Sequence, residues 1–221
     1  MQQDYRLASL PVPAEPAGDA ARWIIHRERP VDQDSHVTVS LADVELPDGT
    51  RFTQYVFRMR RCAMIAVLDE PGTSILLLRR HRFIISRQVW EVPGGYVDDG
   101  EDGPAAAVRE AEEETGWRPR SARLVLSFQP MTGNADYPQD LYIATGADRT
   151  GQPAPDEAAE ARWVPLAEAA AMIADGRIAG AATVIGVQHA LLLRAGTQPP
   201  GHQEPAPPAP PPPGAAPASG P

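Results

Sequence analysis

The sequence predicts a single α/β domain in which a mixed β-sheet is covered by a few helices. Two observations favour this fold class. Apolar runs typical of strands recur through the first part of the chain, bounded by turn residues. Helical signals are few, lie between or after these runs, and each is followed by a glycine. A chain of 221 residues with 43% apolar content can bury one sizeable core between such layers.

The first predicted strands form an antiparallel hairpin. Residues 37–41 and 53–57 are strand-like, and the segment Leu46-Pro47-Asp48-Gly49-Thr50 between them is a turn signal. Two more strands are expected at residues 64–68 and 74–78, on either side of the turn Glu70-Pro71-Gly72. Helices are predicted over residues 104–114, 166–175 and 181–194.

Composition divides the chain into three parts. We expect a partly irregular N-terminal extension over residues 1–35 and a folded domain over residues 36–196, which opens with the hairpin at 36–60. Residues 197–221 are mostly proline, alanine and glycine, which do not assemble a core, so a disordered tail is expected. The first 18 residues lack the apolar core of a signal peptide, and no stretch is long enough to span a bilayer, so the expected compartment is the cytoplasm.

Charge and cysteine usage exclude several function classes. A formal net charge of −9 and a pI near 5.0 argue against a partner that is nucleic acid or an anionic membrane. A small phosphate substrate fits, because bound cations can reverse the local sign of charge. The lone cysteine, Cys62, excludes an internal disulfide framework and a thiolate-rich zinc site. Its apolar surroundings in the sequence predict a buried packing role.

The segment that carries chemistry runs from residue 95 to residue 117, where a short helix lies between two loops. Asp102 or Gly103 can cap the helix, Pro104 suits its first turn, and Gly116 can end it. At about 100° per residue, one arc of this helix is apolar and should be buried. That arc consists of Ala107, Val108, Ala111 and Thr115.

The next arc of the same helix is acidic and consists of Glu110, Glu113 and Glu114. Arg109 precedes Glu113 by four residues, where an ion pair can orient that carboxylate. Glu112 points to a separate, solvated side. Clustered carboxylates beside a glycine loop suit a hard cation such as magnesium, which takes oxygen ligands and shares them with substrate phosphates. A metal between phosphate oxygens assists hydrolysis at phosphorus, so this is the reaction class expected.

The same stretch resembles the Nudix box, G-x5-E-x7-R-E-U-x-E-E-x-G-U, and all fixed positions of that box are present from Gly95 to Gly116. Resemblance to this family implies a Nudix α/β/α sandwich with a mixed β-sheet, here with an N-terminal β-hairpin extension. It also implies that Glu110, Glu113 and Glu114 bind magnesium, with manganese as the alternative. In the family, Arg109 and Glu101 would support the loop, and the backbone carbonyl of Gly94 would be a further ligand.

Outside the box, the chain resembles the ADP-ribose and nucleoside diphosphate sugar pyrophosphatase branch. The similar strings lie at residues 46–49, 77–82, 90–95, 163–166 and 176–185. Two features depart from the branch: Arg80 and His81 replace its commoner glutamine and aromatic residue, and residues 128–133 differ from its usual loop. The branch is typically dimeric through its N-terminal strands, so the resemblance implies a homodimer.

The branch resemblance also implies further site residues. Its general base is commonly a glutamate on a loop after the box, and Glu157 fits best in this sequence. Arg82 and Arg60 lie near positions where the branch places arginines, and a guanidinium suits phosphate oxygens. The expected function is metal-dependent hydrolysis of the diphosphate linkage in a nucleoside diphosphate derivative. ADP-ribose, cleaved to AMP and ribose 5-phosphate, or a related nucleotide sugar is the first candidate substrate.

Three alternatives stay open on the sequence. One is a hydrolase of a nucleoside triphosphate or of another specialised metabolite diphosphate. A second, of another class, is a Nudix-fold ligand sensor without turnover, although the intact box favours catalysis. A third is an isomerase of allylic diphosphates with a catalytic cysteine, which the position of Cys62 on a core strand disfavours.

Overall fold

The computed structural model describes residues 22–153 and 160–196. Its main layer is a seven-stranded mixed sheet with the order β13-β5-β4-β11-β9, to which β6 adds beside β5 and β7 beside β4. Strands β4 and β11 run parallel at its centre, and β9 and β13 lie antiparallel to their neighbours. These strands are β4 (Cys62–Leu68), β5 (Ser74–Arg82), β6 (Arg87–Glu91), β7 (Gly94–Tyr96), β9 (Arg123–Phe128), β11 (Gln139–Thr145) and β13 (Glu160–Pro165).

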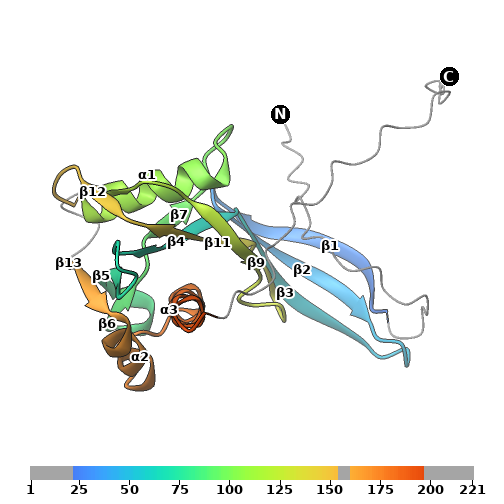
Figure 1. The fold of residues 1–221 in the computed structure, drawn as a ribbon. Coiled ribbons are helices and arrows are strands. Elements are labelled where there is room, and N and C mark those ends of the chain that lie inside the picture. Colours follow the sequence, from blue (N-terminus) through green and yellow to red (C-terminus); the bar gives the residue numbers. More distant parts are fainter. Residues whose placement is uncertain (1–21, 154–159, 197–221) are drawn as a thin grey trace, which may run out of the picture.

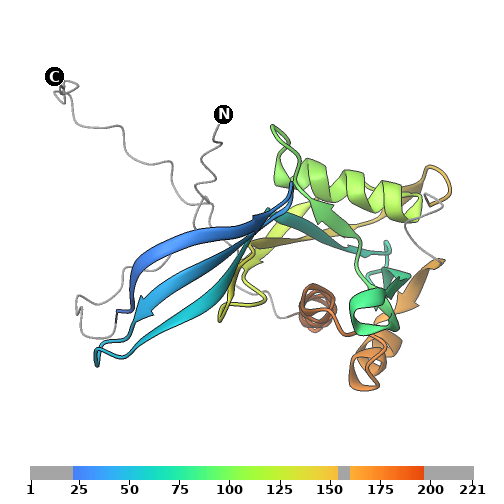
Figure 2. The same cartoon turned by 180° about the vertical axis from the view of Figure 1, so that it is seen from behind.

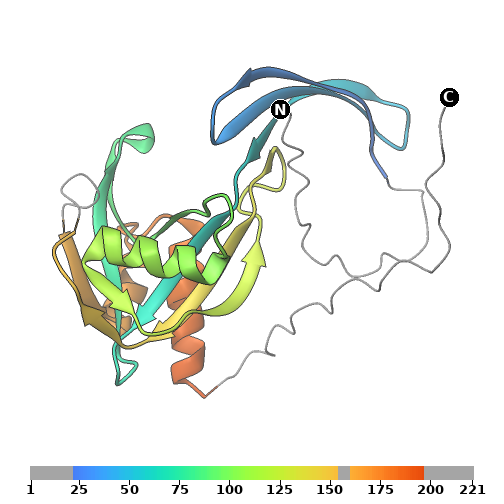
Figure 3. The same ribbon diagram turned by 90° about the horizontal axis from the view of Figure 1, so that it is seen from above.

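Helices cover both faces of this sheet, as Figures 1 and 3 show. Helix α1 (Gly103–Thr115) packs on one face through three buried alanines, Ala106, Ala107 and Ala111. Helices α2 (Leu166–Ala174) and α3 (Ala181–Arg194) pack on the other. Alternate residues of the central strands supply the two cores, because successive side chains of a strand point to opposite faces. The predicted mixed sheet with helices on its faces is therefore confirmed.

The N-terminal strands form a second, four-stranded sheet that projects from the α/β/α layers (Figures 1 and 2). The predicted hairpin is present as β2 (Val37–Glu45) and β3 (Arg51–Met59), paired antiparallel in continuous register. Its turn closes with a hydrogen bond from the Leu46 N–H to the Thr50 carbonyl, at 2.9 Å. On the far edge, β10 (Ala135–Asp136) pairs with β3 in parallel and joins this sheet to the main body.

Within the predicted N-terminal extension, residues 24–33 form strand β1 (Ile24–Gln33), which the sequence analysis did not include. This strand pairs antiparallel with β2, with two register shifts. Most of its side chains are exposed, so it has no buried face to produce an apolar pattern in the sequence. Backbone hydrogen bonds to β2 and an ion pair from Glu28 to Arg58 of β3 hold it in place. Residues 1–21 and the predicted tail over residues 197–221 lie outside the described residues.

The remaining elements are short. Strands β8 (Trp117–Pro119) and β12 (Ala147–Arg149) pair into a two-stranded sheet just after α1. A single 3-10 turn, η2 (Phe83–Ile85), connects β5 to β6. Across the described residues, none of the helices is long and apolar enough to cross a membrane.

Cys62 is buried at the start of β4, as predicted for a packing residue. Its thiol lies 3.1 Å from the Tyr137 hydroxyl. Burial raises the pKa of the Cys62 thiol to about 11, with the Tyr137 hydrogen bond acting in the opposite direction. The reactive thiolate is therefore scarce near neutral pH, which is unsuited to a catalytic cysteine.

Helix α1 begins and ends as its sequence predicts. The Asp102 carboxylate caps the first turn by accepting a hydrogen bond of 2.7 Å from the Ala105 N–H, and Gly116 ends the helix in the left-handed conformation, at φ 72°. The predicted buried arc is correct for Ala107, Ala111 and Thr115. It is wrong for Val108, which is only partly buried, while Ala106 takes its place in the core.

Replacing the cap, Asp102→Ala, should lower the free energy of unfolding by about 1 kcal/mol, because the Ala105 N–H loses its acceptor at the helix terminus. Urea denaturation followed by circular dichroism measures this difference. A midpoint and slope equal to those of the unmodified protein would show that the cap does not stabilise the helix.

Candidate active site

The candidate site lies where strand β7 meets helix α1. Strand β7 pairs with β4 in the register Ala63 with Gly95 and Met64 with Gly94. The chain then crosses a loop and enters α1, whose acidic arc faces back toward the two glycines. The Gly94 N–H donates a hydrogen bond of 2.8 Å to Glu114. The glycines of β7 and the acidic arc of the helix are therefore brought together, as the spacing in the sequence predicts.

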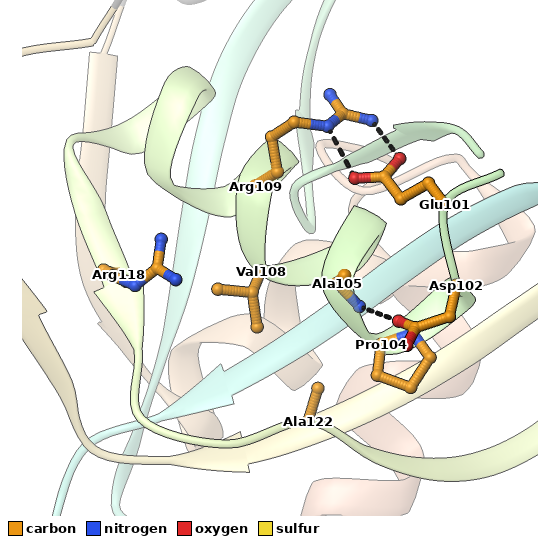
Figure 4. Close-up of a pocket in the computed structure, with 8 residues that line it drawn as sticks. All are labelled: Glu101, Asp102, Pro104, Ala105, Val108, Arg109, Arg118 and Ala122. Carbon is orange, nitrogen blue, oxygen red and sulfur yellow. Dashed lines mark hydrogen bonds and ion pairs between the residues drawn. The ribbon is translucent and has the colours of Figure 1, made fainter. Parts of the chain in front are cut away.

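Arg109 is the centre of the carboxylate cluster. Its guanidinium makes two hydrogen bonds to Glu101, from Nε at 3.0 Å and from Nη2 at 2.9 Å (Figure 4). The third nitrogen, Nη1, donates to Glu110 at 2.7 Å and to Glu113 at 3.2 Å. The hydrogen bonds that Arg109 donates to Glu101, followed by its contacts with Glu110, hold the pKa of Arg109 above its usual value. The expected ion pair between Arg109 and Glu113 is present, and Arg109 with Glu101 ties the loop to the helix.

The three acids of the arc have different surroundings. The side chain of Glu113 is 55% exposed, whereas that of Glu110 is 16% exposed. Glu114 is buried, with one carboxylate oxygen paired to Arg80 of β5 and the other accepting from the Gly94 N–H. Burial raises the pKa of Glu114 to about 7, against the opposing effects of Arg80 and the Gly94 N–H.

The close approach of Glu110 to the loop depends on Gly95. A Cβ atom at this position would lie 2.5 Å from the carboxyl carbon of Glu110 and 2.6 Å from each of its oxygens. The missing side chain therefore leaves the space that the carboxylate fills. Gly94 has a different constraint, because a Cβ there would lie 2.5 Å from the Ala63 carbonyl oxygen. Packing therefore requires the glycine at position 94, where a Cβ would meet backbone, whereas a Cβ at position 95 would displace only the end of the Glu110 side chain.

The donor set fits a hard divalent cation. Glu114 accepts from the Gly94 N–H, the Glu110 carboxylate lies against Gly95, and Glu113 shares Arg109 with Glu110. Magnesium prefers carboxylate oxygens of this kind. Within residues 22–153 and 160–196, no group of three or more acidic, histidine or cysteine side chains already stands in a coordinating arrangement. The arginines Arg109 and Arg80 contact the carboxylates instead.

The other predicted site residues are placed less centrally. Arg60 donates to the Val97 carbonyl at 2.7 Å and lies 3.3 Å from Asp99, so it contacts the loop that leads to α1. Arg82 is ion-paired to Glu91 at 2.8 Å, across the β5–β6 hairpin. Their contact with substrate stays a prediction. Glu157 lies outside the described residues.

Arg80 is a further residue of the site, which the sequence indicates only as a departure from the ADP-ribose pyrophosphatase branch. It lies near the end of β5, and its ion pair crosses from the sheet to α1. The period of the strand indicates where Arg80 lies, because Leu76, Leu78 and Arg80 share one face of β5. Leu76 packs in the core beneath α1, so Arg80 lies on the face that α1 covers. The partner, however, lies 34 residues away in the chain.

A pocket of about 530 Å³ lies on the outer side of α1, as Figure 4 shows. Its charged groups come from Glu101, Asp102, Arg109 and Arg118, and Pro104 and Val108 contribute apolar surface. Glu110, Glu113 and Glu114 do not line it. We place the candidate site on the side of the helix that faces β7, where Glu110 and Glu114 approach Gly95 and Gly94.

The α/β/α layers and a carboxylate cluster beside a glycine loop define a hydrolase-type site on an α/β scaffold. The chain belongs to the Nudix family: the family model described as the NUDIX domain matches residues 58–183. It is a Nudix hydrolase, an enzyme of the class that acts on nucleoside diphosphate derivatives.

Two relatives and one solved structure illustrate the similarity. The chain is 46% identical to the CMP-5'-(N-acetyl-N-hydroxy-3-aminopropyl)phosphonate hydrolase of Streptomyces rubellomurinus, over 81% of this chain and 87% of that protein. It is 30% identical to the ADP-ribose pyrophosphatase of Mycobacterium tuberculosis, over 65% of this chain and 71% of that protein. A crystal structure of an ADP compounds hydrolase shares the fold with a TM-score of 0.68 at 19% identity, over 80% of this chain and 97% of that chain.

Proposed function

We propose that this protein hydrolyses the anhydride bond between a nucleoside 5'-phosphate and a second phosphorus group, with magnesium or manganese as the cofactor. The observation that carries the proposal is that Glu110 and Glu113 share Arg109 while Glu114 binds the Gly94 N–H of β7, in a chain of the Nudix family.

The proposed roles follow from these positions. Glu110, Glu113, Glu114 and the Gly94 carbonyl would hold the cation, which neutralises phosphate charge and makes bound water more acidic. Arg109, anchored by Glu101, keeps the carboxylates oriented toward the loop. Arg60 and Arg82 supply guanidinium groups for the substrate phosphates.

Glu157 is the proposed general base for the reaction. It takes a proton from the attacking water, whose oxygen forms the new bond to phosphorus. The bridging P–O bond breaks, and the nucleoside monophosphate and the second phosphate-bearing product leave.

ADP-ribose is the first candidate substrate, because the chain resembles the ADP-ribose pyrophosphatase branch over most of its domain. A second candidate is a nucleoside monophosphate joined to a phosphonate. It is favoured by the 46% identity to a hydrolase of a CMP-linked phosphonate, which exceeds the 30% identity to the mycobacterial ADP-ribose pyrophosphatase. The reaction at phosphorus is the same for both.

A substrate panel separates the two candidates. Specificity constants are measured for ADP-ribose, a CMP-linked alkylphosphonate, a nucleotide sugar and a nucleoside triphosphate, each with magnesium and with a chelator. We expect nucleoside monophosphate release with magnesium only, from ADP-ribose or the CMP-linked phosphonate. Turnover restricted to the nucleoside triphosphate would contradict the proposed substrate class.

We also propose that the protein is a homodimer that pairs through the N-terminal sheet. Between residues 37–41 of β2 and 55–59 of β3, one face is apolar and carries the cross-strand pairs Val39 with Phe57 and Leu41 with Tyr55. Tyr55 is 55% exposed, and the sheet projects from the main body (Figure 2). An apolar face of this kind is typical of a surface that a second copy of the chain covers.

Placing a charge on this face, Tyr55→Asp, should convert the dimer to a monomer, because burying an unpaired carboxylate at an interface is unfavourable. Light scattering coupled to gel filtration measures the molar mass. Leu192→Glu is the matched control, since Leu192 is 46% exposed but lies on α3. A monomeric unmodified protein, or a Tyr55→Asp variant that stays dimeric, would contradict the assignment.

A further inference from the structure

Arg80 and Glu114 form a buried ion pair between the sheet and the box helix. The side chain of Glu114 is 4% exposed and that of Arg80 is 17% exposed. The second carboxylate oxygen of Glu114 is held by the Gly94 N–H at 2.8 Å. Both oxygens of a carboxylate assigned to the cation are therefore already bound within the protein.

The two arginines of the site differ in how they are anchored. Arg109 contacts Glu110 and Glu113 with one nitrogen and is fixed by two hydrogen bonds to Glu101, so its charge is balanced outside the arc. Arg80 enters from β5 and places its guanidinium directly on Glu114. A dication that binds Glu114 must therefore displace this guanidinium or accept a positive charge beside it, which is electrostatically unfavourable.

We propose that Arg80 is a positioning residue that neutralises Glu114 in the metal-free protein and competes with the divalent cation for its carboxylate. This inference rests on the proposed metal site and adds a residue to it. The Arg80 guanidinium keeps the buried Glu114 carboxylate paired and close to Gly94 until the cation arrives. When the cation displaces the guanidinium, the Glu114 carboxylate is free to bind the cation.

Manganese binding without substrate tests the inference, with electron paramagnetic resonance as the readout of free Mn²⁺. Arg80→Gln should bind Mn²⁺ more tightly, by about tenfold or more, because a full positive charge beside the site is lost. The same variant should melt at a lower temperature without metal and gain more from Mn²⁺ than the unmodified protein, since Glu114 loses its partner.

Arg79→Gln is the matched control. Arg79 is adjacent in β5 but points to the other face, where its guanidinium lies 3.7 Å from Glu160. Its Mn²⁺ affinity should equal that of the unmodified protein. Arg80→Lys keeps the charge and should bind Mn²⁺ more weakly than Arg80→Gln.

Equal or weaker Mn²⁺ binding by folded Arg80→Gln would overturn the competition. Unmodified protein that binds no Mn²⁺ would instead overturn the metal site itself. The two failures are distinguishable because the first is seen in the variant and the second in the unmodified protein. If Arg80→Gln does not fold, the unmodified protein is titrated with magnesium instead. The guanidinium resonances of its arginines are then monitored by NMR during the titration. The Arg80 signal should change on saturation, and an unchanged signal would overturn the inference.

Discussion

Replacing Glu113 by glutamine should lower kcat by about a thousandfold while leaving the fold intact. The carboxylate is proposed to contact the cation, and an amide at this position removes a negative charge from the site. Because the Glu113 side chain is 55% exposed and its ion pair with Arg109 lies at the surface, the free energy of unfolding should change little. Steady-state kinetics and urea denaturation measure the two quantities.

Glu112→Gln is the matched control for this variant. Glu112 is the preceding residue of α1 and is ion-paired to Arg118, at 2.5 Å, away from the glycine loop. Its kcat should stay within about twofold of the unmodified value. Equal activity in the two variants would mean that the acidic arc is an ordinary solvated helix face.

Gly95→Ala should lower kcat/KM by about a hundredfold, the cost expected when a catalytic group is displaced by about 1 Å. The added methyl would lie 2.5 Å from the Glu110 carboxyl carbon, so that carboxylate must move away from the loop. The clash is with the end of a flexible side chain, and the free energy of unfolding should therefore change by less than about 1 kcal/mol.

The control and the contrast for this variant come from other glycines. Gly133→Ala meets no atom within 4 Å and should leave kcat/KM unchanged. Gly94→Ala would clash with backbone at 2.5 Å, at a residue with φ 154°, and should destabilise the whole domain. An active Gly95→Ala enzyme would show that the position of Glu110 does not matter for turnover.

The parts of the fold that the sequence predicted are those with local signals. Helix α1 carries its cap, its first-turn proline and its terminal glycine in adjacent residues, so both of its ends could be predicted. The hairpin of β2 and β3 likewise has its turn and its alternating residues in one stretch.

Strands β1 and β11 were not predicted, for different reasons. Strand β1 has exposed side chains and is held by pairing with β2, so it leaves no apolar period. Strand β11 is buried along almost its whole length between β4 and β9, yet it opens with Gln139 and Asp140, which hide the strand in the sequence.

The candidate site follows the same division. The i and i+4 spacing of Arg109 and Glu113 predicted their ion pair, because the helix itself sets that distance. Helical spacing also grouped Glu114 with the other acids, but it did not predict that this residue is buried. Its burial depends on the packing of α1 on the sheet, where Arg80 of β5 meets it. The strand period places Arg80 on the face beneath α1 but does not encode its contact with Glu114.

We propose that the box carboxylates and a divalent cation hydrolyse a phosphorus anhydride attached to a nucleoside. Phosphorus NMR of the purified protein with ADP-ribose, and separately with a CMP-linked phosphonate, tests this proposal most directly. With magnesium, we expect loss of the anhydride resonances of one substrate and growth of a nucleoside monophosphate signal, which chelator and Glu113→Gln both abolish. Unchanged spectra for both substrates, or equal cleavage in chelator, would contradict it.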